Sequence, residues 1–279
     1  MKLVLDEKKI RKGRPIGLPY IGSKKKIAKK LIEIVKQNFG TDKTIYDLFG
    51  GGGAITLECK LQGLDVVYND IDPIPGLMIQ KILSEDREYL KTLICSREEF
   101  FQIRDKEDKT IDDHLKLLIN SFGNDCKSYL YGKKHSDIKY TLAKEIIKNH
   151  DCFSGYKQTE TYKRCIAKNG RLKHLVRIQQ LERLQQLKQL ENIQGIEANG
   201  KIKFYNKDYK EFSDIKNSII YLDPPYKDTK KAYKHNNLDY ENFYKWCEYM
   251  SKDNMVLSVP KFCFIISISF LAIFFLLPI

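Results

Sequence analysis

Four residues that follow an apolar run carry the side chains best suited to chemistry: Asp223, Pro224, Pro225 and Tyr226. The run itself, residues 219–222, predicts a buried strand, and the two prolines prevent further ladder pairing beyond it. An acid and an aromatic ring therefore stand at the carboxyl end of a strand, where open α/β sheets bind ligands. The Asp223 carboxylate and the Pro224 carbonyl could accept both hydrogens of an exocyclic amine, and Tyr226 could stack on the flat base that carries the amine.

The chemistry that fits these groups is transfer of a substituent to such an amine. Because its lone pair is delocalised into the ring, the amine is a poor nucleophile, and two hydrogen bonds would draw the nitrogen toward tetrahedral geometry. Taken alone, Asp-Pro-Pro-Tyr could equally be a strand-ending turn, since Asp and Pro are common in turns. The choice between these interpretations depends on the elements upstream.

A glycine loop between two predicted strands indicates a nucleoside site. Residues 44–49 predict a strand that runs into four glycines, and a helix over 54–62 and a strand over 64–68 follow. The glycines allow close backbone approach, and Asp70 stands after the second strand, where it could bind ribose hydroxyls. The spacing differs from G-x-G-x-x-G, which favours a single adenosine-bearing cofactor over a dinucleotide. Four glycines could also be a flexible turn, but Asp70 favours nucleoside binding.

The remaining predicted elements place further polar groups near this edge. Residues 6–14 are basic and polar and predict a loose arm. Ser23 is a candidate N-cap for the amphipathic helix that follows it, and Gly22 allows close approach of the backbone. Asp208 follows a predicted third strand over 202–205, so it could reach an adenine amine, although an exposed turn acid fits almost as well.

The middle of the chain predicts an inserted domain, because residues 80–168 are polar and helical in pattern. Lysines and tyrosines alternate there in a way that suits a nucleic-acid surface, although a solvated basic helix has the same pattern. These residues are Lys127, Tyr129, Tyr131, Lys133 and Lys134. Beyond them, apolar residues recur every third position from Leu172 to Leu190, which predicts a long helix wedged between the inserted domain and the sheet.

Composition is compatible with a polyanionic partner. The 279 residues include 49 Lys and Arg against 36 Asp and Glu, which gives a formal net charge of +13. Seven cysteines are scattered without a C-x-x-C pair, as in a reduced cytosolic protein, and no His/Cys cluster predicts a metal site. We therefore expect no metal.

In their order along the chain, five segments resemble the Dam-like (D12 class) adenine-specific DNA methyltransferases. They are residues 19–24, 47–53, 69–71, 208–209 and 223–226. The resemblance implies methyl transfer from S-adenosylmethionine to N6 of an extrahelical adenine, by direct displacement without a covalent enzyme intermediate. Relatives that act on a glutamine amide carry Asn in place of Asp223, so the acid favours adenine.

By the same resemblance, Asp223, Pro224, Pro225 and Tyr226 are catalytic. The cofactor would be held by Tyr20, Lys24, Asp47, Phe49, Gly50, Gly51, Gly52, Gly53, Asp70 and Asp208. The implied fold is α/β, a Rossmann-like methyltransferase sheet with an inserted helical target-recognition domain. We expect the cofactor-binding part over 15–80, the inserted domain over 81–168, the catalytic part over 169–259 and an apolar tail over 260–279.

The expected partner is double-stranded DNA, and the expected setting is the cytoplasm of a bacterium or phage-infected cell, with the protein acting as a monomer in restriction–modification. The resemblance fails at residues 262–279, which carry no charge. An aberrant terminus that truncates the last strands is the preferred interpretation, over a membrane anchor or core strands. Two alternatives to an active enzyme follow: an inactive truncated DNA-binding remnant, and a membrane-tethered methyltransferase-like regulatory protein.

Overall fold

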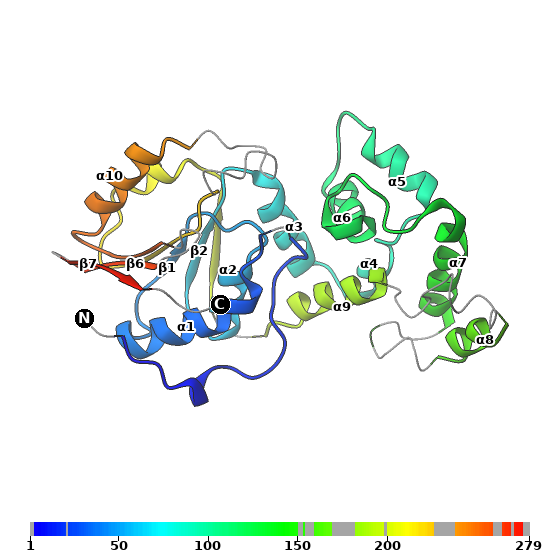
Figure 1. Cartoon of the computed structure of the whole chain (residues 1–279), viewed down its shortest axis with the longest axis horizontal. Helices are drawn as coiled ribbons and strands as arrows, with labels where there is room; N and C mark the ends of the chain where they lie inside the picture. The colour runs from blue at the N-terminus through cyan, green and yellow to red at the C-terminus, as the bar shows by residue number, and fades with distance from the viewer. Residues whose placement is uncertain are drawn as a thin grey trace. The chain divides into compact units, whose positions relative to one another are not determined.

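A computed structural model describes residues 3–20, 22–149, 153, 159–168, 182–197, 200–225, 238–258, 264–268 and 271–275. The chain divides into two compact units (Figure 1). Unit 1 comprises Met1–Gly17, Gly22–Gly76 and Ile196–Ile279, and unit 2 comprises Leu18–Ile21 and Leu77–Gly195. Unit 2 extends past residue 168, so the segment up to Gly195, which the sequence analysis assigns to the catalytic part, clusters with the helices of unit 2.

A sheet of seven strands forms the centre of unit 1, in the order β3-β2-β1-β4-β5-β6-β7. Its strands are β1 (Ile45–Asp47), β2 (Val66–Asn69), β3 (Ile202–Tyr205), β4 (Ile219–Leu222), β5 (Met255–Ser258), β6 (Phe264–Ile268) and β7 (Leu271–Phe275). The pairs among β1 to β5 are parallel. Strand order reverses at β1 and β4, so unit 1 has the topological switch point of a Rossmann-like α/β fold.

Helices cover both faces of this sheet, and the inner parallel strands β2 and β4 are buried along their whole length. The helices α1 (Lys25–Phe39) and α2 (Ala54–Leu61) bury Leu31, Ile55 and other apolar residues on one face. On the other face, α10 (Tyr240–Met250) and the 3₁₀ helix η5 (Tyr209–Phe212) contribute Trp246 and Phe212 to a second core cluster. Figure 1 shows α1 and α10 on opposite sides of the strands.

The amino-terminal arm is docked, which corrects the prediction of a loose arm. Val4 exchanges two backbone hydrogen bonds of 2.8 Å with the Asn38 side chain at the end of α1. Arg11 donates two hydrogen bonds, of 2.7 and 2.8 Å, to the fully buried carboxylate of Glu58 in α2. Polar and basic residues are typical of a solvated arm, but here they pair with side chains on two helices. The arm also includes η1 (Glu7–Lys9).

The tail contributes two strands, so the sheet does not stop at β5 as the sequence analysis expects. β6 pairs antiparallel with β5, with Val256 opposite Ser267, and β7 pairs antiparallel with β6. An uncharged run of β-branched and aromatic residues suits a sheet strand as well as a membrane span, which is why composition alone could not decide. None of the helices in the described part of the chain has the length and apolar character that a bilayer crossing needs.

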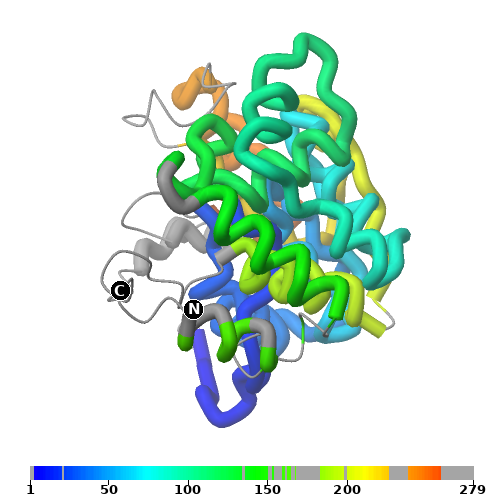
Figure 2. Tube along the Cα trace, turned by 90° about the vertical axis from the view of Figure 1, so that its right-hand side faces the viewer, coloured from blue at the N-terminus to red at the C-terminus, as the bar shows by residue number. Residues whose placement is uncertain are grey.

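Unit 2 is helical where the structure describes it. Its helices are α3 (Pro73–Ser84, entering from unit 1), α4 (Arg87–Lys91), α5 (Arg97–Arg104), α6 (Ile111–Asn120), α7 (Lys133–Asn149), α8 (Glu160–Lys168) and α9 (Glu182–Gln194), with the 3₁₀ helix η2 (Phe122–Asn124). α7 packs on α5 and α8 (Figure 2), and α9 packs on α4 and α6. Leu184, Leu187 and Leu190 of α9 are buried, whereas residues 169–181 of the predicted long helix lie outside the described residues.

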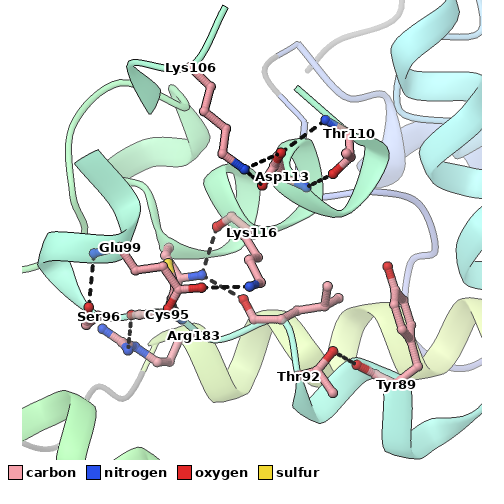
Figure 3. A network of polar contacts seen from close by, with 12 residues as sticks. Tyr89, Thr92, Cys95, Ser96, Glu99, Lys106, Thr110, Asp113, Lys116 and Arg183 are labelled. Carbon is pink, nitrogen blue, oxygen red and sulfur yellow. Dashed lines mark hydrogen bonds and ion pairs between the residues drawn. The ribbon is translucent and has the colours of Figure 1, made fainter. Parts of the chain in front are cut away.

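The core of unit 2 corrects the prediction that alternating tyrosines and lysines form a surface. Tyr129 and Tyr131 are buried, while Lys127 and Lys133 are exposed. The reason is Arg183 of α9, which is 0% exposed and lies against the rings of both tyrosines. Its guanidinium donates to the Cys95 carbonyl at 3.2 Å, as Figure 3 shows, and to the Tyr129 hydroxyl at 2.7 Å. The side chain of Lys134 lies outside the described set.

Candidate functional site

Asp223 stands directly after β4, and its carboxylate is paired with a lysine that lies 199 positions earlier in the chain. The Lys24 ammonium lies 2.5 Å from Asp223 Oδ2, and the two side chains are only 17% and 16% exposed. Burial raises the pKa of Asp223 above its usual value, and the nearby Lys24 charge opposes that rise. The structure therefore brings together two predicted site residues, one from the catalytic set and one from the cofactor set.

The two prolines after Asp223 are held by the helix that follows. Pro224 is buried, and the Pro225 carbonyl accepts a hydrogen bond from the Tyr240 hydroxyl of α10. Tyr226, the fourth residue of the motif, lies outside the described residues. β4 therefore ends as the sequence predicts. The hydrogen bond from α10 fixes the backbone at Pro225, the last residue of the motif that the structure describes.

Asp47 ends β1, and its side chain is 1% exposed. Its Oδ2 accepts hydrogen bonds from the backbone nitrogen of Thr56 at 3.2 Å and from the Thr56 hydroxyl at 2.7 Å. Its Oδ1 is buried and has no hydrogen-bond partner among the described residues. Burial, with smaller contributions from Asp223 and Asp70, raises the pKa of Asp47 to about 7, although Thr56 opposes the rise. Thr56 is a supporting residue that sequence reasoning did not name.

The four glycines form a tight turn over a buried tyrosine. Gly51 and Gly53 have φ angles of 44° and 70°, in the left-handed region that favours glycine. A Cβ on Gly50 would lie 2.3 Å from Cε2 of Tyr68, whose hydroxyl donates to the Gly51 carbonyl at 2.9 Å. The Tyr68 ring therefore packs against the loop and fixes its backbone. Phe49, just before the loop, packs on rings of the second core cluster.

Asp70 lies at the end of β2 and closes the glycine loop. Its Oδ2 accepts a 2.8 Å hydrogen bond from the Gly51 backbone nitrogen. The Asn206 amide donates to the carbonyls of Asp70 and Ile71, which fixes the backbone there. Ile71 is 48% exposed and so offers an apolar surface beside the acid. Sequence reasoning used Ile71 only as part of a motif, although its position directly after a strand-ending acid was a signal.

Asn69 connects three strand ends and was also not assigned a role from the sequence. Its amide donates to the carbonyls of Leu48 and Lys207, at 3.2 and 3.0 Å, and its Oδ1 accepts from the Lys207 nitrogen at 2.9 Å. Next to it, Asp208 is exposed, and its Oδ1 accepts from the Lys210 nitrogen, which caps η5. This capping contact is the one expected of an exposed acid in a turn.

At the amino-terminal side, the N-cap of α1 differs from the expected one. Lys24, not Ser23, is the N-cap residue of α1, and it makes no side-chain capping bond. The Ser23 hydroxyl is buried without a hydrogen-bond partner in the described part of the chain, because the helix begins one residue later than a serine cap requires. Tyr20 clusters with unit 2, and Ile21 lies outside the described residues.

The site as described is therefore a row of acids at the carboxyl edge of adjacent parallel strands. Asp47 is in register with Tyr68 of β2 and Tyr221 of β4, so the ends of these strands lie together. No group of three or more His, Cys, Asp or Glu residues that could hold a metal occurs among the residues that the structure describes. Such an edge suits a cationic or hydrogen-bond-donating ligand.

Comparison with known proteins identifies the chain's relatives. The D12 class N6 adenine-specific DNA methyltransferases match residues 20–257, which is most of the chain and spans the whole site. The chain belongs to this family. It is also 26% identical over 232 residues to the Type II methyltransferase M2.HphI of Haemophilus parahaemolyticus, covering 77% of this chain and 67% of that protein.

Among solved structures, the rRNA methyltransferase AviRa of Streptomyces viridochromogenes covers 83% of this chain and 72% of its own, at 9% identity and a TM-score of 0.31, a likeness too slight to support an argument. Family membership makes this chain an N6 adenine-specific DNA methyltransferase. The glycine loop, Asp70 and Asp223 all belong to unit 1.

Proposed function

We propose that the carboxyl edge of β1, β2 and β4 binds S-adenosylmethionine beside a flipped adenine, and that Asp223 accepts hydrogen bonds from the adenine amine during methyl transfer. The observation that carries this proposal is the common edge, at which Asp47 ends β1 and Asp70 and Asp223 follow the neighbouring parallel strands β2 and β4. Ligands of open α/β sheets bind outside such an edge, at the point where strand order reverses.

The residues of the edge fit S-adenosylmethionine in two respects. The partnerless, buried Oδ1 of Asp47 is an acceptor suited to a cationic ligand. The four glycines carry no side chains, so a ligand could approach the backbone of the loop closely. Asp70 would accept from ribose hydroxyls, and Ile71 would pack on the adenine ring. When bound, the cofactor supplies an electrophilic methyl group on a sulfonium centre.

The protein's task in a direct displacement is orientation and polarisation of the amine. Asp223 and the Pro224 carbonyl would accept the two N–H hydrogens, which directs the nitrogen lone pair toward the methyl carbon. The bound cofactor would supply the methyl group and keep the electrons of the broken C–S bond on its sulfur, and the proton lost from the amine nitrogen would pass to the Asp223 carboxylate and from there to water. Tyr226 would stack on the flipped base; this role rests on the family resemblance.

Unit 2 would recognise double-stranded DNA. The chain carries a net charge of +13, which suits a polyphosphate. In unit 2, residues 121–128 form a loop, closed by a 2.8 Å hydrogen bond from the Phe122 nitrogen to the Ser128 carbonyl. The Phe122 side chain on this loop is 67% exposed, and Lys127 on the same loop is exposed as well. A loop that carries an apolar ring and a cation can contact both bases and phosphates.

The test of the proposed roles is a pair of variants assayed with tritiated S-adenosylmethionine and unmethylated DNA. Asp223→Ala should abolish methylation while the cofactor's Kd stays within about tenfold, because Asp223 meets the amine. Asp70→Ala should mainly raise the cofactor's Kd. Asp214→Ala, which removes an exposed acid of the same unit, is the matched control and should stay active.

Two results would overturn the assignment. If cofactor binding and turnover were lost together in Asp223→Ala, the separation of amine and nucleoside roles would be wrong. If the unaltered chain bound cofactor and DNA but transferred no methyl group, the chain would be the inactive DNA-binding remnant.

A further inference from the structure

Lys24 is the residue whose position differs most from the role that the family resemblance implies for it. The resemblance puts Lys24 with the cofactor. Its ammonium instead lies 2.5 Å from Asp223 Oδ2, on the acid that would meet the adenine amine. Both side chains are mostly buried, so solvent screens this pair less than it screens the exposed ion pairs of the same unit, such as Lys30 with Glu7.

The backbone before α1 directs this side chain. Gly22 has a φ of 77°, in the left-handed region, and Lys24 is the last residue before the helix. The Lys24 ammonium also lies 3.4 Å from the Gly22 carbonyl. The next residue, Lys25, runs elsewhere, since its Cγ would lie 3.3 Å from a Cβ on Gly17, where the arm passes the glycine loop. The side chains of these two adjacent lysines therefore lie against different parts of unit 1.

The charges around Asp223 make the lysine important for the acid's ionisation. Asp47, from β1, interacts electrostatically with Asp223, and Asp70 at the end of β2 acts on Asp47 in turn. From α10, Tyr240 reaches the Pro225 carbonyl two residues along. Lys24 is the cation that opposes protonation of Asp223, whose pKa burial raises. A protonated Asp223 would lose much of its capacity to accept the amine's hydrogens.

We propose that Lys24 is a positioning residue for adenine methylation: its ammonium holds Asp223 ionised through one carboxylate oxygen and leaves the other oxygen to the amine. This inference rests on the proposed role of Asp223. It moves Lys24 from the cofactor to the base, and it requires that cofactor affinity depend little on Lys24.

The experiment compares Lys24→Met with Lys26→Met, which removes an exposed lysine two residues further on, in the first turn of α1. Methylation at saturating DNA and S-adenosylmethionine is measured from pH 5 to 9, and the cofactor's Kd by calorimetry. For Lys24→Met we expect the acid limb of kcat to move up by about one to three pH units, because an opposite charge at this range shifts a carboxyl pKa by that amount. The cofactor's Kd should change less than threefold. Lys26→Met should leave both unchanged.

Two further variants distinguish a positioning role from a structural one. Lys24→Arg keeps the positive charge and should restore most of the acid limb. In an Asp223→Asn background the side chain keeps an acceptor oxygen but no longer titrates, so adding Lys24→Met should not shift the profile further. If Lys24→Met does not fold, Lys24→Gln provides the same neutral comparison.

The inference is overturned if the acid limb stays in place, or if Lys24→Met weakens cofactor binding tenfold or more while kcat at saturation is unchanged. The second result would return Lys24 to the cofactor site. Failure of the proposed function looks different, because it shows without any Lys24 variant: Asp223→Ala would lose cofactor binding together with turnover or would retain methylation, or the unaltered chain would transfer no methyl group.

Discussion

Each unit of this methyltransferase holds one tight loop against a buried tyrosine, and the two loops differ in what they offer a ligand. In unit 1, the hydroxyl of Tyr68 donates to the carbonyl of Gly51. In unit 2, Tyr129 lies just after loop 121–128, and its hydroxyl donates to the Cys95 carbonyl while accepting from Arg183. Both rings are buried, so each loop rests on a fixed support.

The turns themselves are built from different residues. The loop of unit 1 achieves its positive φ angles with glycines alone and carries no side chains over four residues. The loop of unit 2 places Asn124 and Cys126 at φ angles of 59° and 57°, where such side chains are uncommon, and it exposes the ring of Phe122. Asn124 is held by hydrogen bonds to Leu118 and Gln186, which offset the strain.

The difference fits the size of the ligand that each loop would meet. A backbone without side chains suits a small molecule that comes close to peptide groups, as at other glycine-rich nucleoside sites. A loop that displays an aromatic ring and a lysine suits a large polyanion whose surface it can touch.

The largest expected effect comes from closing the first loop. Gly50→Ala would put a Cβ 2.3 Å from the Tyr68 ring, which cannot retreat because Gly76 and Phe204 lie on it. We expect a loss of about 3 kcal/mol or more in the free energy of unfolding, together with at least tenfold weaker cofactor binding. Chemical denaturation and calorimetry measure the two quantities.

The matched control is Gly195→Ala in unit 2, where the nearest atom to an added Cβ lies at 3.6 Å, an ordinary contact. It should change stability by less than about 1 kcal/mol. Equal effects of the two substitutions would show that the Tyr68 support does not set the shape of the glycine loop.

The support of the second loop should be weaker but still substantial. Arg183→Met keeps much of the buried volume and removes two hydrogen bonds and the contacts with the rings of Tyr129, Tyr131 and Tyr140. We expect a loss of about 2–3 kcal/mol in unfolding free energy, because buried polar groups lose partners. Arg104→Met, at an exposed arginine paired with Asp105, should cost less than about 1 kcal/mol. A neutral Arg183→Met would mean that apolar packing alone holds the loop.

Local patterns were sufficient to predict the edge of the sheet. The strands over 202–205 and 219–222 have the predicted bounds, and the strand before the glycine loop is present but shorter, at Ile45–Asp47. These elements are apolar runs that end at glycine, proline or acid, so the signal lies within a few residues.

The contacts that organise the site could not be predicted in this way. Lys24 and Asp223 are 199 positions apart, and nothing in either motif indicates that their charges meet. Thr56 reads as one residue of a helix, and only the fold shows that it holds Asp47. Tyr129 alternates with lysines as a surface residue would, yet a buried arginine far along the chain turns it into core. Such contacts depend on topology, which sequence periodicity does not encode.

The buried acid of unit 1 predicts a smaller, pH-dependent effect. The pKa of Asp47 is raised to about 7 from an ordinary value of 3.8, so the folded state holds a proton that the unfolded chain has released. Stability from this group is therefore full below about pH 4 and is lost as pH rises toward 7, at about 1.4 kcal/mol per pH unit. Asp47→Asn does not titrate. Relative to the unaltered chain it should gain about 2 kcal/mol between pH 5 and pH 7.5.

Thermal unfolding of both proteins without cofactor across this pH range measures the difference. Cofactor affinity should fall in Asp47→Asn, because the amide cannot ionise on meeting a cationic ligand as the carboxyl group can. A constant stability difference from pH 5 to pH 7.5 would show that Asp47 is ionised throughout.

The smallest effect on stability, and the sharpest separation of stability from function, is expected at the exposed ring of unit 2. Phe122 is 67% exposed, so Phe122→Ser should change the free energy of unfolding by less than about 0.5 kcal/mol. If the loop meets DNA, the same substitution should weaken DNA binding several-fold and leave the cofactor's Kd unchanged. Tyr249→Ser removes a comparably exposed ring, 56% accessible, from α10 of unit 1 and is the matched control. Fluorescence anisotropy with a labelled duplex, at two salt concentrations, measures the affinity, and the salt slope should persist in Phe122→Ser because the lysines remain. Equal DNA affinity of Phe122→Ser and the unaltered chain would remove this ring from the DNA surface and leave the loop with a purely structural role.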